Sequence, residues 1–106
     1  MTVARISLMK ILPHNRNEVT RLHASLEEFL SKQKGYILGF SFEAIGDTET
    51  MGRVSLWASE EDANHAATLD HTVGLRSQIH ILTEPGHIEQ LVHVSPTAHN
   101  IPKPLR

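Results

Sequence analysis

Eight histidines are the most conspicuous chemical feature of this sequence. They are His14, His23, His65, His71, His80, His87, His93 and His99. Imidazole titrates near neutral pH, so a histidine that faces a pocket can take up a proton from a ligand. We interpret His71, His80 and His93 as proton acceptors of this kind.

A metal site built from these histidines is the alternative interpretation. The sequence contains no H-E-x-x-H motif and no histidine pair four residues apart, the spacing at which a helix presents two ligands to one ion. His87 and His93 share a strand face, but the extended chain between them spans about 20 Å. A site formed by His71, His80 and a strand histidine would need tight distances across several segments. We therefore expect no bound metal.

The single tryptophan, Trp57, shares a predicted sheet face with small polar and basic residues. Alternation along the strands places Ser7, Arg53 and Ser55 on this face. Such a set is typical of a pocket wall that binds an aromatic ligand. The alternative is that Trp57 is a core aromatic residue whose indole N–H needs a partner.

Arg76 is the candidate for stabilising negative charge in such a pocket. A fixed cation there would stabilise a phenolate or another oxyanion, whereas most arginines lie on the surface. Arg5 and Arg53 lie on the same mixed sheet face as Trp57. Their alternative role is an ion pair with Glu43 or Glu89 at the rim of the sheet.

The composition excludes several classes of function. The chain has 106 residues and no cysteine, so disulfides, thiolate nucleophiles and cysteine-bound metals are excluded. Its 10 basic and 12 acidic residues argue against a nucleic-acid partner. No apolar run approaches the ~18 residues that span a membrane, and the N-terminus lacks the pattern of a signal peptide. We expect a cytoplasmic protein.

The pattern of apolar residues and turn residues predicts a single domain over residues 1–95. Its elements alternate as strand, helix, strand, strand, helix, strand, over residues 3–12, 15–34, 36–45, 52–58, 59–82 and 88–95. The second helical segment has a predicted break near residues 72–74. A proline-rich tail, residues 96–106, follows. This order predicts an α+β fold with a ferredoxin-like βαββαβ protomer.

Capping patterns predict where the helices begin. Asn15 with Glu18, and Ser59 with Asp62, fit the capping box in which a side chain satisfies free backbone N–H groups. Gly35 predicts the end of the first helix. The Glu27-Glu28 pair is interpreted as part of that helix's solvated face.

The predicted four-stranded antiparallel sheet carries apolar residues on both faces. One alternating set is almost entirely apolar, and the other is the mixed face that contains Trp57. Right-handed connections place both helices on one side, so they cover one face only. An uncovered apolar face is an interaction site. We therefore expect a homodimer in which two sheets face each other.

Two segments carry a resemblance to a known family. They are Lys32-Gln-Lys-Gly-Tyr-Ile at the end of the first helix and Val54-Ser-Leu-Trp-Ala-Ser-Glu-Glu-Asp-Ala after the third strand begins. With the helix start after Pro13, they resemble the antibiotic biosynthesis monooxygenase family of dimeric α+β barrels, over about residues 3–95. The resemblance implies a pocket between sheet and helices. Some members oxidise polycyclic phenols to quinones with O2 and no metal or flavin, and others degrade haem.

The resemblance carries over to single residues only in part. Trp57 matches the strand tryptophan that lines the pocket in both branches, and Arg76 is placed like an arginine of the quinone-forming branch. Arg53 stands where that branch has asparagine. Ser7 stands where the haem-degrading branch has asparagine, and Ala67 stands where it has a helical histidine.

The expectation that follows is a cofactor-independent monooxygenase acting on a planar phenolic or quinone-like small molecule. Trp57 would position the ring, His71 or His80 would take the proton, and Arg76 would stabilise the anion. Ser7, Arg53, Ser55 and His93 would contribute to ligand binding. A haem-binding or haem-degrading protein and a non-catalytic binding module are the alternatives.

Overall fold

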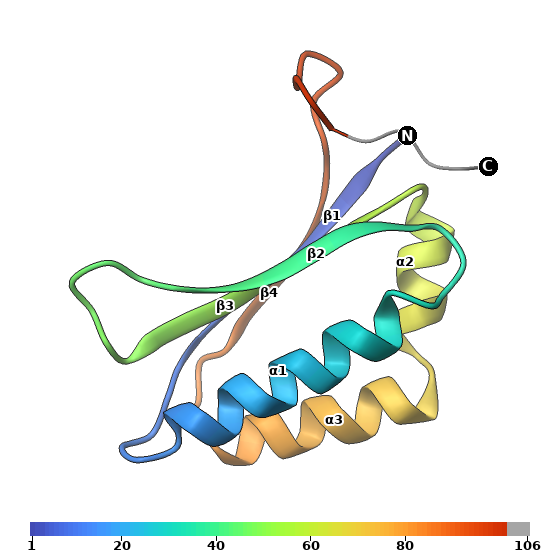
Figure 1. Ribbon diagram of the computed structural model, residues 1–106. Helices are drawn as coiled ribbons and strands as arrows, with labels where there is room; N and C mark the ends of the chain where they lie inside the picture. The colour runs from blue at the N-terminus through green and yellow to red at the C-terminus, as the bar shows by residue number, and fades with distance from the viewer. Residues whose placement is uncertain (102–106) are drawn as a thin grey trace.

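The computed structural model describes residues 1–101 of the chain (Figure 1). Its elements, in chain order, are β1 (Val3–Lys10), α1 (Arg16–Leu30), β2 (Tyr36–Glu43), β3 (Thr50–Trp57), α2 (Glu60–Ala67), α3 (Asp70–Ile81) and β4 (Ile88–His93). The last part of the predicted tail, residues 102–106, lies outside the described residues.

The four strands form one antiparallel sheet in the order β2-β3-β1-β4. The three helices lie on the same side of this sheet (Figure 1). The ferredoxin-like α+β protomer predicted from the sequence is confirmed. Within residues 1–101, no helix lies on the opposite side of the sheet.

Helix α1 packs on the sheet through an apolar stripe at three- and four-residue spacing. Val19, Leu22, Leu26 and Leu30 are buried along it. Its predicted capping box is wrong, because the Asn15 side chain makes no cap hydrogen bond and donates to the Leu82 carbonyl instead.

The end of α1 also differs from the prediction. The helix stops at Leu30, and the Ser31 hydroxyl donates to the Glu28 carbonyl, which satisfies one of the free acceptors at the helix end. The chain then turns until Gly35, whose φ of 84° is the left-handed conformation that glycine adopts without strain.

The second helical segment is divided at Thr68 and Leu69, not near residues 72–74. The Thr68 hydroxyl donates to the His65 carbonyl and closes the last turn of α2. Gly74 lies inside α3, where tertiary packing overrides its low helix propensity. The predicted cap at Ser59 is confirmed, because its hydroxyl accepts from the Asp62 backbone N–H at 3.1 Å.

The mixed sheet face packs against the helices and contains the core. Trp57, Met9 and Met51 point from this face toward α1 and α3 and are buried. The almost purely apolar set therefore faces away from the helices. We call it the outer apolar face: Ile6, Leu8, Leu38, Phe40, Phe42, Val54, Leu56, Ile88, Val92 and Val94.

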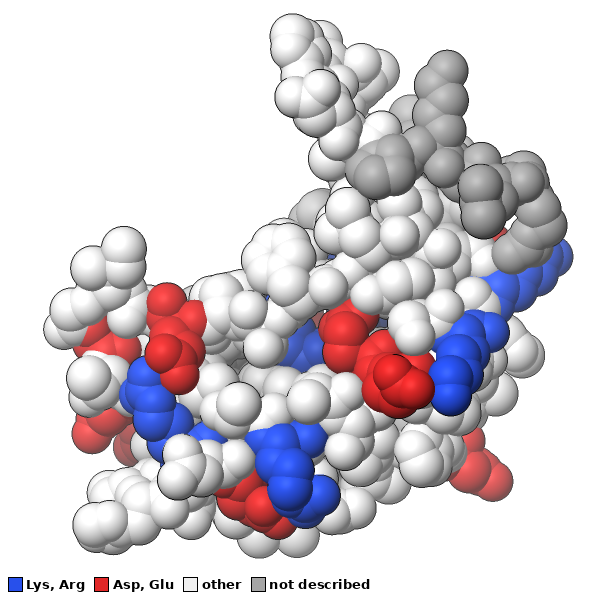
Figure 2. Space-filling view, in the orientation of Figure 1, with Lys and Arg blue, Asp and Glu red and all other residues white. Residues whose placement is uncertain are grey.

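The face of the molecule seen in Figure 2 is mixed in charge, with acidic and basic side chains interspersed over its described part. None of the helices within residues 1–101 has the length and apolar character needed to cross a membrane.

Candidate functional site

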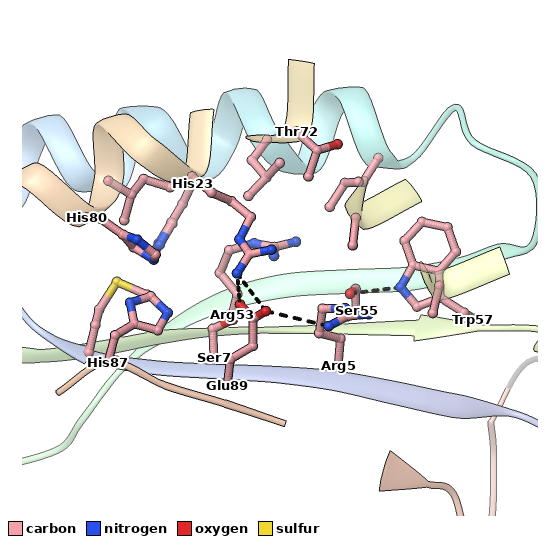
Figure 3. A pocket seen from close by; sticks show the side chains of 17 residues that line it. Arg5, Ser7, His23, Arg53, Ser55, Trp57, Thr72, His80, His87 and Glu89 are labelled. Carbon is pink, nitrogen blue, oxygen red and sulfur yellow. Dashed lines mark hydrogen bonds and ion pairs between the residues drawn. The ribbon is translucent and has the colours of Figure 1, made fainter. Parts of the chain in front are cut away.

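A single pocket between the sheet and the helices collects most of the polar side chains of the mixed face. It encloses about 480 Å³ of empty space, part of which is open to solvent. Strands β1, β3 and β4 form its floor, and all three helices contribute to its walls (Figure 3).

Strand register explains why these side chains meet. Ser7 lies opposite Arg53 on β3 and opposite Glu89 on β4, while Arg5 lies opposite Ser55. Directly opposed residues share a sheet face, and their Cβ atoms are about 5 Å apart. Alternation thus projects all five side chains into one space below the helices.

Trp57 forms one end of the pocket (Figure 3). It is 1% exposed, and its indole N–H donates to the Ser55 hydroxyl at 3.0 Å. The Tyr36 ring meets it edge to face, with ring centroids 5.5 Å apart. These two contacts fix the orientation of a large aromatic surface at the pocket wall.

Arg76 reaches the pocket from α3 and binds Glu89. Its guanidinium donates to both carboxylate oxygens of Glu89 at 2.6 Å. Glu89 also lies 3.5 Å from the Arg5 guanidinium and accepts from the Ser7 hydroxyl. Burial lowers the pKa of Arg5, and the charge of Glu89 opposes this change. One carboxylate therefore holds two arginines at the centre of the site.

Arg53 is held by a different carboxylate, that of Glu27 on α1. The two groups are 2.6 Å apart, and Glu27 also accepts from the Tyr36 hydroxyl. Burial and this hydrogen bond raise the pKa of Tyr36. The interpretation of Glu27 as a solvated residue was wrong. The sequence alone does not show that an Arg53 guanidinium from the sheet lies within its reach.

The histidines predicted to accept protons lie in different places. His80 lines the pocket near its mouth, where it is also exposed to solvent. His71 lies outside the lining, because the first turn of α3 directs it toward Phe29, with ring centroids 4.4 Å apart. His93 also lies outside the lining, at the end of β4 opposite Val3.

Two other histidines line the pocket. His23 on α1 is 1% exposed, and burial together with the charge of Arg53 lowers its pKa to about 4. His87 precedes β4 and stacks edge-on against His80 at 4.4 Å. Burial lowers the pKa of His87, and His80 adds to this effect. The sequence feature that could have indicated the burial of His23 is its place in the apolar stripe of α1, between Leu22 and Leu26.

Within residues 1–101, no group of three or more His, Asp or Glu side chains is arranged to hold a metal ion. The predicted ligand-binding residues Ser7, Arg53 and Ser55, together with Trp57, Arg76 and His80, do line one pocket. Their roles remain predictions.

Comparison with known proteins identifies the fold. No protein-family model matches the sequence, and no curated protein matches it significantly. SnoaB from Streptomyces nogalater, which is described as a cofactor-independent oxygenase, is similar in structure, with a TM-score of 0.80 at 11% identity. The similarity covers 91% of this chain and 95% of that chain.

Two further solved structures show the same likeness. A conserved protein from Methanosarcina mazei Go1 has a TM-score of 0.84 at 15% identity, over 90% of this chain and 94% of that one. A structure described as an antibiotic biosynthesis monooxygenase has a TM-score of 0.79 at 16% identity, over 89% and 99%. The predicted resemblance is confirmed at the level of the fold, which this chain shares with antibiotic biosynthesis monooxygenases.

Proposed function

We propose that this protein is a cofactor-independent monooxygenase that oxidises a planar phenolic small molecule to a quinone. The observation that carries the proposal is the meeting of a fixed aromatic wall, Trp57, with three arginines in one pocket. Among residues 1–101, only two carboxylates, Glu27 and Glu89, pair with Arg5, Arg53 and Arg76. One positive charge is left to attract an anionic ring.

The reaction needs a phenolate rather than a phenol. The ionised ring passes an electron to O2 more readily than the neutral one does. In the overall reaction, one oxygen atom of O2 becomes bonded to a ring carbon. The other leaves as water with the ring hydrogen and the phenolic hydrogen. The protein contributes binding, removal of a proton and stabilisation of the anion.

Each step has a candidate residue. The ring lies against Trp57, and the arginines stabilise the phenolate because their guanidinium groups keep their charge at neutral pH. His80 accepts the proton, since it faces the pocket and also contacts solvent, to which the proton can be released. Ser7 and Ser55 orient Glu89 and Trp57 through hydrogen bonds.

The shared fold supports this function, because SnoaB is described as a cofactor-independent oxygenase. The haem-degrading alternative has less support. Ala67, at the position of that branch's helical histidine, lines the pocket and offers no ligand. A saturable Soret band on adding haemin would favour the alternative.

Oxygen uptake tests the proposal. The purified protein is incubated with polyhydroxylated two- and three-ring aromatics in an oxygen electrode, and products are identified by mass spectrometry. We expect O2 consumption with incorporation of one oxygen atom into the product. Binding without oxygen uptake across the panel would contradict an oxygenase and indicate a non-catalytic binding module.

Two variants test the residue assignment. Trp57→Phe and Arg76→Ala should each lower kcat/KM by about tenfold or more, since each removes a contact to the reacting ring. Arg21→Ala is the matched control. Arg21 is an exposed arginine of α1 that pairs with Glu18 outside the pocket. Unchanged turnover in both pocket variants would refute the assignment.

We also propose that two copies of the chain associate through the outer apolar face. This face extends across all four strands, and Phe40 and Ile88, on the two edge strands, are 51% and 56% exposed. Exposed apolar side chains at both edges of one sheet face indicate an interaction site. A second identical sheet is apolar in the same way and has the same need to be covered.

A further inference from the structure

Four side chains of the described structure have buried polar atoms without a hydrogen-bond partner. These atoms are both ring nitrogens of His23, both ring nitrogens of His87, Nε of Arg53 and the hydroxyl of Thr72. All four residues line the pocket described above. Buried polar groups are nearly always paired, and an unpaired one is costly. Their gathering at one cavity indicates that a ligand supplies the missing partners.

The two histidines mark a distinct part of this cavity. His23, His80 and His87, which we call the histidine end, lie at the end opposite Trp57, with the arginines between them (Figure 3). His23 comes from α1, and His87 from the segment before β4. The ring of His80 packs edge-on against the ring of His87, with ring centroids 4.4 Å apart.

Two of these rings, His23 and His87, favour the uncharged form of imidazole. Burial and the positive charge of Arg53 keep the pKa of His23 near 4, and burial lowers that of His87. A neutral imidazole has one N–H donor and one nitrogen acceptor. A hydroxyl group between the two rings can accept from the N–H of one ring and donate to the bare nitrogen of the other. A carboxylate only accepts, and would leave that bare nitrogen unpaired.

We propose that the histidine end, with His23 as its principal residue, is a binding subsite for a second hydroxyl group of the ligand. The ligand class is then a planar fused-ring aromatic with hydroxyl groups at opposite ends. One oxygen lies near the arginines and Trp57, and the other between His23 and His87. The identification of the ligand as a phenol rests on the proposed function, whereas the subsite rests on the unpaired atoms.

Calorimetric titration without oxygen tests the subsite separately from turnover. The probes are 2-naphthol, 2,6-dihydroxynaphthalene and 6-methoxy-2-naphthol, with the corresponding anthracene derivatives as a longer series. We expect the dihydroxy compound of at least one series to bind about fivefold or more tightly than its monohydroxy parent. The methoxy compound accepts but does not donate, so it should bind no better than the parent.

Variants of His23 locate the effect. His23→Phe keeps an aromatic ring but removes both polar atoms, so the preference for the dihydroxy compound should fall to about onefold. His23→Gln retains a donor and an acceptor and should keep part of the preference. His65→Phe, at an exposed histidine of α2 outside the pocket, is the matched control and should bind like the wild type.

The outcomes separate this proposal from the proposed function. Equal affinities for the mono- and dihydroxy compounds in both series would overturn the subsite, as would a preference that survives in His23→Phe. The first of these results needs only the wild type, so it holds even where a variant fails to fold. Discrimination without oxygen uptake would support the subsite and contradict the oxygenase. Oxygen uptake without discrimination would do the reverse.

Discussion

Glu27 and Glu28 are neighbours on α1 with opposite environments. The Glu27 side chain is 22% exposed and holds the buried guanidinium of Arg53, whereas Glu28 is 71% exposed and pairs with Lys32. Glu27→Ala would leave Arg53 buried without a partner. We expect it to lower the free energy of unfolding by about 2–4 kcal/mol. Glu28→Ala should change it by less than about 0.5 kcal/mol. Urea denaturation of both variants measures the contrast, and equal losses would contradict this account of Glu27.

His23 makes stability depend on pH. Its folded pKa of about 4 lies below the ordinary value of 6.5, so the unfolded chain binds a proton first as the pH falls. The stability of the neutral form is fully present above pH 6.5 and is lost between pH 6.5 and 4. The wild type should lose about 2 kcal/mol more than His23→Phe between pH 7.5 and 5. Parallel losses in urea denaturation would show that His23 is not the titrating group.

The contents of the site could be predicted from the sequence where strand alternation decides them. Side chains alternate between the two faces of a strand, so Ser7, Arg53 and Ser55 share a face with Trp57 however the helices pack. The helical residues could not be predicted as well. Whether His71 or Thr72 faces the pocket depends on where α3 begins, since each residue turns the helix by about 100°.

At the scale of the elements, two glycines differ in the space around them: Gly39 in strand β2 is crowded, and Gly74 in helix α3 is not. A Cβ atom on Gly39 would collide with the Glu27 carboxylate and lie 2.7 Å from the Tyr36 hydroxyl, whereas one on Gly74 meets nothing within 4 Å. Gly39→Ala should therefore destabilise the protein by about 1–3 kcal/mol by displacing Glu27. Gly74→Ala should stabilise it by about 0.5–1 kcal/mol, because alanine favours a helix interior. Thermal unfolding of the two variants measures both signs, and a gain of stability in Gly39→Ala would refute the crowding.

The elements themselves could be predicted more reliably than their ends. Apolar periodicity located every strand and helix, but the end of α1 and the break between α2 and α3 were misplaced. In both places a hydroxyl, from Ser31 or Thr68, donates to a backbone carbonyl three residues earlier and closes the helix. Such local bonds compete with helix continuation and leave little trace in apolar patterning.

At the scale of the whole molecule, the sheet separates two different environments. Its mixed face is covered by helices and contains the candidate site, while no helix of the described residues covers its outer apolar face (Figure 1). This is the reverse of a simple half-exposed sheet, in which the polar face meets water. The arrangement is stable in water when a further apolar surface covers the outer apolar face, which is the reason for proposing a second copy.

Association through this face predicts a specific response to added charge. Phe40→Asp places a carboxylate within the proposed contact, where it would be desolvated without a partner. We expect the wild type to have twice the 11.9 kDa chain mass by light scattering, and Phe40→Asp to be a monomer. Val73→Asp on α3 is the matched control, because Val73 is 49% exposed and Phe40 51% exposed, but on opposite sides of the molecule. It should remain a dimer. A monomeric wild type, or dissociation by Val73→Asp alone, would show that the outer apolar face is not the contact.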